Sequence, residues 1–261
     1  MTQNERRRWL IRALLDERPG QYGDVGIPSG EADQRRLLRA LMNVRPPRPA
    51  DAELLRVQDA YLAEELRRRG VTDAGELTPV TGNLYLWRGD ITTLKVDAIV
   101  NAANSALLGC FCPNHGCIDN AIHTYAGIQL RLACAALMEA QGGEEPVGAA
   151  KITPAFNLPS RYVLHTVGPV IHGRTSERDR AQLADCYRSC LDLADRSGVR
   201  SIAFCCISTG EFHFPNDQAA RIAVETVRAH GAVRQNRMKV IFNVFQERDE
   251  ILYQRWLGAA Q

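Results

Sequence analysis

The stretch Asn101–Gly127 reads NAANSALLGCFCPNHGCIDNAIHTYAG and joins an apolar, strand-like run to a long helical pattern. Four potential metal ligands gather inside this joint, because Cys110, Cys112, His115 and Cys117 fall within eight residues. Thiolate and imidazole are the borderline-soft ligands that zinc prefers. Three such ligands around a tetrahedral zinc ion leave the fourth position open, which is typical of a catalytic site. The stretch therefore predicts a zinc site beside the positive end of a helix, where an anion is also favoured.

The residues alone do not decide which of the four potential ligands bind the metal. Cys110, His115 and Cys117 form a C-x4-H-x-C pattern, and Cys112 either replaces Cys110 or joins it. Binding by all four residues would give a closed structural staple, and thiols without metal are a third alternative. We favour the open three-ligand site.

Asp119 lies in the first turn of the predicted helix, two residues after Cys117. Its charge is favourable there because the N-terminal end of a helix is positive, so helix capping is the simplest role. A carboxylate beside a metal could also act as a general base. His123 follows one helical turn later and could pair with Asp119, although we expect it to be a core histidine.

From about Leu84 onwards, strand-like runs alternate with helical patterns. Such alternation predicts an α/β layered domain with a largely parallel sheet. The runs Val96–Val100 and Ile202–Ile207 are almost continuously apolar, as expected of central strands covered on both faces. We predict strands at Leu84–Trp87, Val96–Asn101, Ala149–Thr153, Tyr162–Val167, Ser201–Ile207 and Lys239–Phe245, and helices at Ile118–Glu139, Ser176–Ser197, Asp217–His230 and Asp249–Leu257.

Ligands of such sheets bind beyond the carboxyl ends of the strands. The loop after Ile207 begins with small residues that expose backbone N–H groups and hydroxyl donors, which suits a diphosphate. Its candidate binding residues are Ser208, Thr209, Gly210, Glu211 and Phe212.

Two further loops carry polar side chains next to predicted strand ends. The turn Gly89–Thr92 contains Asp90, which could accept from an exocyclic amine such as that of adenine or could simply close the turn. Asn101 and Asn104 place two carboxamides after another strand. Each could orient a hydroxyl or a water, or form an Asx turn that ties down the loop.

Residues 1–80 carry three helical patterns. The first spans Glu5–Glu17, the second is expected to be capped by Ser29, and the third to be capped by Asp51 and closed by Gly70. The apolar stripes are narrow, so we expect an N-terminal helical extension that packs on a main domain of residues 81–261. A partner-binding module is the alternative.

Composition narrows the class of protein. With 45% hydrophobic residues and a net charge of +2, the chain predicts a globular core and no nucleic-acid or membrane partner. The N-terminus MTQNERRRW lacks the apolar segment of a secretory signal, and no run approaches the ~18 apolar residues of a membrane span. The eight cysteines are therefore expected as reduced thiols and metal ligands in the cytoplasm.

Five motifs follow one another along the chain: GDIT at Gly89–Thr92, VDAIVNAANSALLG at Val96–Gly109, IDNAIHTYAG at Ile118–Gly127, NLPSRYVLHTVGP at Asn157–Pro169 and ISTGEFHFP at Ile207–Pro215. Together they resemble the macrodomain family, whose fold binds ADP-ribose. CFCPNHGC, in place of the family's glycine-rich run, is similar to the zinc-dependent subgroup, and so is LMNVRPP in the N-terminal helices. The resemblance implies a three-layer α/β/α macrodomain with a mixed, largely parallel central sheet.

The resemblance also implies roles for individual residues. Asp90 and the Ile91 backbone would bind adenine, and Asn104 would position the distal ribose. Asp119 takes the place of the carboxylate that other hydrolytic macrodomains use. The residues Ser208 to Phe212 would hold the diphosphate, and Cys110, His115 and Cys117 would bind Zn²⁺.

Members of the subgroup remove mono-ADP-ribose from proteins, often in microbes beside a sirtuin-type ADP-ribosyltransferase. The hypothesis is therefore a zinc-dependent hydrolase that acts on ADP-ribosylated protein and yields ADP-ribose. The alternative is a reader module that binds ADP-ribose with a structural zinc and no turnover. A third interpretation is a phosphohydrolase that acts on free ADP-ribose derivatives.

Overall fold

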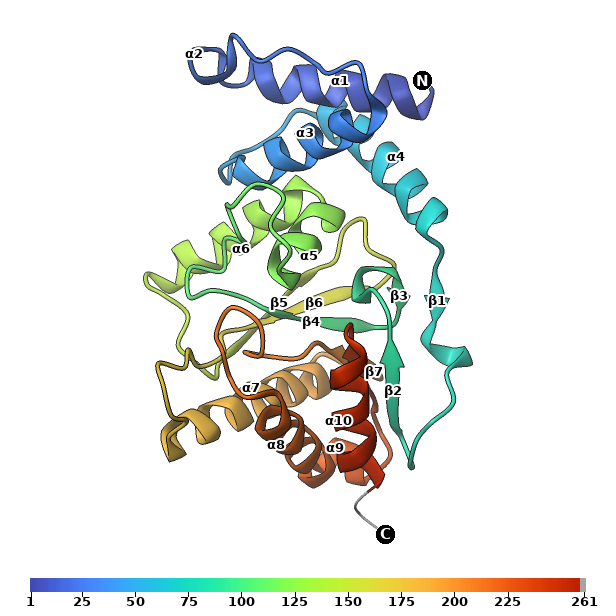
Figure 1. Ribbon diagram of the computed structural model, residues 1–261, viewed down its shortest axis with the longest axis vertical. Helices are drawn as coiled ribbons and strands as arrows, with labels where there is room; N and C mark the ends of the chain where they lie inside the picture. The colour runs from blue at the N-terminus through green and yellow to red at the C-terminus, as the bar shows by residue number, and fades with distance from the viewer. Residues whose placement is uncertain (259–261) are drawn as a thin grey trace.

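The computed structural model describes residues 1–258 and is built around a six-stranded sheet (Figure 1). The strand order is β2-β8-β7-β4-β6-β5, and every neighbouring pair is parallel except β5 and β6. The strands are β2 (Leu84–Arg88), β4 (Ala98–Ala102), β5 (Ala150–Pro154), β6 (Tyr162–Thr166), β7 (Ser201–Phe204) and β8 (Lys239–Val244). A small parallel pair, β1 (Thr72–Asp73) with β3 (Leu94–Lys95), lies apart from it. The mixed, largely parallel sheet is confirmed.

Helices cover both faces of this sheet (Figure 1). One face carries α5 (Ile118–Ala126) and α6 (Ile128–Gln141). The other carries α7 (Glu177–Arg196), α8 (Asn216–Ala229), α9 (Gly231–Arg234) and α10 (Glu247–Gly258). Because strand β4 is covered on both sides, its residues Ala98, Ile99 and Val100 are fully buried. The predicted three-layer α/β/α fold is therefore confirmed. Within residues 1–258, no helix is both long enough and apolar enough to cross a bilayer.

Two predicted elements differ from the structure by more than two residues. The strand expected at Ser201–Ile207 ends at Phe204, because the chain turns away from the sheet where Thr209 donates through its backbone and hydroxyl to the Cys206 carbonyl. The helix expected at Ile118–Glu139 is two helices that separate at Gly127. Gly127 has φ 95° and ψ 172°, a conformation that essentially only glycine adopts, so the helix cannot continue through it.

The N-terminal helices are α1 (Gln3–Asp16), α2 (Pro19–Tyr22), α3 (Glu31–Val44) and α4 (Ala52–Arg69). Helix α3 packs on α5, and α4 contacts the start of α6 through Gln58, whereas α1 packs on α3 and α4 (Figure 1). The N-terminal helices also share a hydrophobic core of their own, which includes Leu10, Leu38 and Leu62 and reaches Ile128 of α6. Asp51 caps α4 as predicted, accepting from the Leu54 amide. The prediction for Ser29 was wrong: Gly30 is the N-cap of α3, and no side chain caps it.

Three loops that follow parallel strands meet at one edge of the sheet. Strand β2 leads to a 3₁₀ turn, η2 (Ile91–Thr93), strand β4 leads to the cysteine-rich stretch, and β7 leads to the loop that contains Ser208. The chain thus brings distant sequence motifs to the carboxyl ends of parallel strands of one sheet, where α/β sheets bind ligands.

Candidate functional site

The loop Cys110–Cys117, called the metal loop below, brings three potential ligands together. One ligand atom from each of Cys110, His115 and Cys117 lies within 4.8 Å of the others. The Cys110 Sγ atom is 3.7 Å from Nδ1 of His115. Tetrahedral bonds of about 2.3 Å to sulfur and about 2.0 Å to nitrogen separate ligand atoms by roughly 3.5–3.8 Å, so this set fits zinc.

Cys112 is exposed and does not belong to this group of three ligands. The structure thus favours Cys110 as the first cysteine of the set. Cys117 is the N-cap of α5, and its Sγ accepts from the Asn120 amide at 3.4 Å. Burial raises the pKa of the Cys117 thiol to about 12. A bound dication would reverse this effect, because metal coordination deprotonates a thiol.

Asp119 is buried directly behind the metal loop. Its Oδ1 accepts from Asn101 Nδ2 at 2.8 Å, so the strand end of β4 orients the first turn of α5. Burial raises the pKa of the Asp119 carboxyl to about 6, although the Asn101 hydrogen bond and the charge of Arg131 oppose that rise. Asp119 is therefore mostly ionised at neutral pH and able to accept a proton.

His123 is buried one turn along α5, and its Nε2 lies 3.5 Å from Asp119 Oδ1. Among residues 1–258 neither ring nitrogen has a hydrogen-bond partner. Burial lowers the pKa of His123 well below its usual value, and the nearby His165 and Arg131 lower it further. The ring is thus neutral and does not form a charged pair with the carboxylate.

The loop that follows β7 has the properties of an anion cradle. In the described part of the chain, the backbone N–H groups of Gly210, Glu211 and Phe212 donate to no protein acceptor. The hydroxyl of Ser208 is also buried without a partner, and Ser208 has a positive φ of 64°. Gly168 of the neighbouring strand-end loop makes room for it, since a Cβ there would lie 2.0 Å from Ser208 Oγ.

The metal loop and the cradle face each other. The Nε2 atom of His115 lies 3.5 Å from Oε1 of Glu211. Thr209 adds a hydroxyl that already donates to the Cys206 carbonyl at 3.0 Å. Soft metal ligands, a buried carboxylate and free amide donors therefore surround one place at the carboxyl edge of the sheet.

Asp90 lies at another loop of the same edge and closes a turn. It accepts from the Thr92 amide at 3.0 Å and from the Thr92 hydroxyl at 2.7 Å. Its other oxygen pairs with Arg69, the last residue of α4, at 3.0 Å. The Arg69 guanidinium also stacks on Tyr125, 3.5 Å from the ring centroid. Ile91 is buried beside this turn.

Asn104 forms the Asx turn that the sequence left as an alternative. Its Oδ1 accepts from the Ala106 amide at 3.1 Å, and its Nδ2 donates to the Gly109 carbonyl at 3.1 Å. These contacts hold the segment that leads into the metal loop.

Sequence reasoning missed the residues that support the site from outside it. Arg39 and Asn43 come from α3, and Asn120 and Arg131 come from α5 and α6; all four contact the metal loop or the segment before it. Arg39 and Asn43 lie more than 70 residues from their partners, so no local pattern could have found them.

Comparison with known proteins places these features among relatives. A family model described as "Macro domain" matches residues 100–223. A "Protein-ADP-ribose hydrolase" of Treponema medium is 59% identical over 262 residues, covering 99% of this chain and 100% of the relative. A "Probable bifunctional ADP-ribose hydrolase/ADP-ribosyltransferase" of Fusarium oxysporum f. sp. cubense is 43% identical, covering 85% of this chain and 40% of that protein. The solved Trypanosoma brucei macrodomain in complex with ADP-ribose is similar with a TM-score of 0.62 and 34% identity, covering 84% of this chain and 95% of that one.

Proposed function

Because this chain belongs to the macrodomain family, we propose that it is a hydrolase that removes mono-ADP-ribose from modified protein side chains. The name of the Treponema medium relative supports this activity, since the alignment spans essentially both chains. The observation that carries the proposal is the contact between the metal loop and the cradle, with Asp119 buried alongside.

The cradle would bind the diphosphate of the substrate. The free amides of Gly210, Glu211 and Phe212 and the Ser208 hydroxyl supply donors for phosphate oxygens. Thr209 holds the shape of this loop, because its hydroxyl donates to the Cys206 carbonyl. Asp90 and the Ile91 backbone would bind adenine at the end of β2, which β8 separates from β7. With the substrate bound in this orientation, the distal ribose and the protein attached to it would lie towards the metal loop.

Asn104 and Asn101 would orient the reacting end of the substrate. Asn104 borders the metal loop and would position the distal ribose. Asn101 fixes the carboxylate of Asp119 with its 2.8 Å hydrogen bond. Asp119 would accept a proton from the water that attacks the ribose and pass one to the leaving side chain, so that ADP-ribose and unmodified protein are released.

Cys110, His115 and Cys117 would hold Zn²⁺. A zinc ion there would supply Lewis-acid polarisation next to the distal ribose. The ligand separations support a bound cation, because one ligand atom from each of two cysteines and a histidine lies within 4.8 Å of the others, as around a tetrahedral zinc ion. Zinc dependence of turnover is thus part of the proposal.

We also propose that the protein acts on the products of an ADP-ribosyltransferase, of the sirtuin type, in the cytoplasm. The name of the Fusarium relative supports a link between the two activities. All eight cysteines of this chain are free thiols, which suits a reducing compartment.

Release of ADP-ribose from a mono-ADP-ribosylated protein tests the function, with zinc content measured on the same samples. We expect turnover with about one zinc per chain, loss of both on exhaustive chelation, and recovery when zinc is returned. Cys117→Ser should lose zinc and turnover, whereas Cys112→Ser should keep both because Cys112 lies outside the ligand group.

Binding of ADP-ribose without turnover by the zinc-loaded protein would contradict the hydrolase and establish the reader module instead. Full turnover by metal-free Cys117→Ser would contradict zinc dependence and leave the hydrolase in place. Release of phosphate from ADP-ribose 1″-phosphate, without action on modified protein, would identify a phosphohydrolase.

A further inference from the structure

We propose that helix α3 of the N-terminal extension braces the metal loop, and that Arg39 and Asn43 are positioning residues that set its affinity for zinc. This inference rests on the zinc site of the proposed function. It assigns a role to the extension that neither the sequence patterns nor the names of the relatives provide.

Arg39 reaches from α3 to both ends of the loop's hydrogen-bond network. Its Nη2 donates to the backbone carbonyl of His115 at 2.9 Å. Its Nε and Nη2 also donate to Asn120 Oδ1, at 3.2 and 2.8 Å. One guanidinium therefore fixes the backbone of a ligand and the side chain of the first turn of α5.

Asn120 passes this constraint to the three cysteines of the loop. It is fully buried, and its Nδ2 donates to the carbonyls of Cys112 at 3.0 Å and Cys110 at 3.5 Å. Its backbone amide donates to Cys117 Sγ at 3.4 Å. With Oδ1 held by Arg39, the amide cannot rotate, so its Nδ2 stays directed at the loop.

Asn43 holds the loop at its tightest point. Its Oδ1 accepts from the backbone amide of Asn114 at 2.9 Å, and its Nδ2 donates to Thr124 Oγ1 at 3.0 Å. Asn114 has φ 56°, a left-handed conformation that non-glycine residues adopt at some cost. The hydrogen bond from α3 stabilises this turn immediately before His115.

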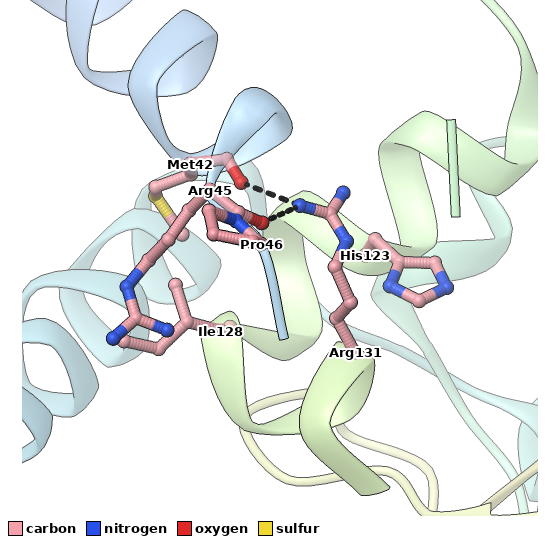
Figure 2. A pocket seen from close by; sticks show the side chains of 7 residues that line it. Met42, Arg45, Pro46, His123, Ile128 and Arg131 are labelled. Atoms are coloured by element: carbon pink, nitrogen blue, oxygen red, sulfur yellow. Dashed lines mark hydrogen bonds between the residues drawn. The ribbon is translucent and has the colours of Figure 1, made fainter. Parts of the chain in front are cut away.

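Arg131 of α6 joins the carboxyl end of α3 to the segment before the metal loop. In Figure 2 its guanidinium points to the carbonyls of Met42 and Arg45, across a cavity of about 10 Å³ that His123 also lines. Its Nε donates to the Leu108 carbonyl at 2.6 Å, and the group stacks on Phe111, 4.2 Å from the ring centroid.

These contacts have one physical consequence. A short surface loop would have to lose conformational freedom when it closes around a cation, which would weaken binding. Here a packed helix orders the loop in advance through partly buried hydrogen bonds, of which those from Arg39 are charge-assisted. Supporting contacts behind metal ligands typically change affinity by about 10- to 100-fold, so α3 is expected to act at that scale.

The test is the zinc dissociation constant of the full-length protein, measured by competition with a chromophoric chelator. We expect Arg39→Met and Asn43→Ala to bind zinc about 10- to 100-fold more weakly than the wild type. Arg39→Lys keeps the positive charge but lacks the planar guanidinium that donates to two acceptors at once, so its affinity for zinc should lie between those of the wild type and Arg39→Met. Arg35→Met is the matched control, because Arg35 lies one turn earlier on α3 and pairs with Glu31 and Glu65 instead.

Circular dichroism of each variant reports whether the fold is intact. If Arg39→Met does not fold, Arg39→Lys and Asn43→Ala decide the matter. Variants that fold and bind zinc as tightly as Arg35→Met would overturn the brace while leaving the proposed function untouched. A wild-type protein that takes up no zinc would instead overturn zinc dependence and the brace with it.

Discussion

Asp119 is held in place by a chain of buried polar side chains that begins on the far strands of the sheet. The Asn101 Nδ2 group that donates to Asp119 also lies 3.2 Å from His165 Nδ1, which must then accept. His165 Nε2 therefore carries the proton and donates to Thr153 Oγ1 at 2.9 Å. The orientation of Asn101, and through it that of Asp119, depends on a neutral His165.

This dependence predicts how stability changes with pH. Burial lowers the pKa of His165 to about 4, against about 6.5 in an unfolded chain. The unfolded state thus binds the extra proton first. The contribution of His165 is fully present above pH 6.5 and is lost as pH falls towards 4, by about 2–3 kcal/mol between pH 7 and 4.5.

Urea denaturation of the wild type and of His165→Gln across that range checks the expectation. The variant lacks the titrating group, so the stability difference between the two proteins should shrink as pH falls. A difference that stays constant from pH 7 to 4.5 would show that His165 has an ordinary pKa.

At the residue scale, the sequence predicted what is local. Cys110, His115 and Cys117 lie within eight residues, and Cys117 marks the start of a helix, so their spacing sufficed to predict that their side chains gather. The contacts of Arg39 with His115 and Asn120 span 76 and 81 residues. They depend on how two helices pack, and no spacing in the chain encodes that.

Among the elements, the break between α5 and α6 shapes the site most. Gly127 lets the chain turn so that α5 presents Asp119 to the metal loop while α6 supplies Arg131 from a separate axis. A side chain at Gly127 would also meet Gln129 and Gln58, since a Cβ would lie 2.7 Å from each.

Gly127→Ala is accordingly expected to destabilise the protein by about 2–3 kcal/mol, through backbone strain and crowding together. Gly142→Ala is the control, because Gly142 has φ 74° in the left-handed region but nothing within 4 Å of a Cβ. It should cost only about 1 kcal/mol. Equal losses in urea denaturation would mean that the close approach at Gly127 has no energetic effect.

The apolar pattern around Gly127 explains why the sequence predicted a single helix at Ile118–Glu139. The apolar pattern continues from Ile118 through Leu130, and a glycine within it reads as a tolerated interruption. In the structure, α5 ends at the extended, positive-φ conformation of Gly127, where Asn157 donates to the Ala126 carbonyl and Gln58 accepts from the Ile128 amide. These two partners lie far away in the sequence, so no local pattern shows them. The alternating strands and helices were predictable, because apolar periodicity directly reflects which faces are buried.

At the scale of the whole molecule, residues 1–258 form two hydrophobic cores. The larger belongs to the sheet and its covering helices, and the smaller to the N-terminal helices together with Ile128. The contacts between them are rich in polar groups: Gln58 Nε2 donates to Gln129 Oε1, and the Ile128 amide donates to Gln58 Oε1. A boundary of this kind favours separate local opening.

We therefore expect native-state hydrogen exchange to reveal two units, with amides of α1 and α3 exchanging at lower free energy than those of β4 and β7. Leu38→Ala removes a buried side chain of the smaller core. It should lower the free energy of opening for amides of α1 and α3 by about 2–5 kcal/mol and leave that for amides of β4 and β7 nearly unchanged. Equal protection of both units, lowered together by this substitution, would indicate one cooperative structure.

The pairing of Arg69 with Asp90 has a consequence for anyone who would trim this chain to a minimal scaffold. Residues 81–258 contain the six-stranded sheet but lack the Arg69 guanidinium, which pairs with the Asp90 carboxylate and covers Tyr125. The site proposed for adenine would then present an unpaired carboxylate and an uncovered aromatic ring. Nucleotide preference, and not merely solubility, would shift in the shortened protein.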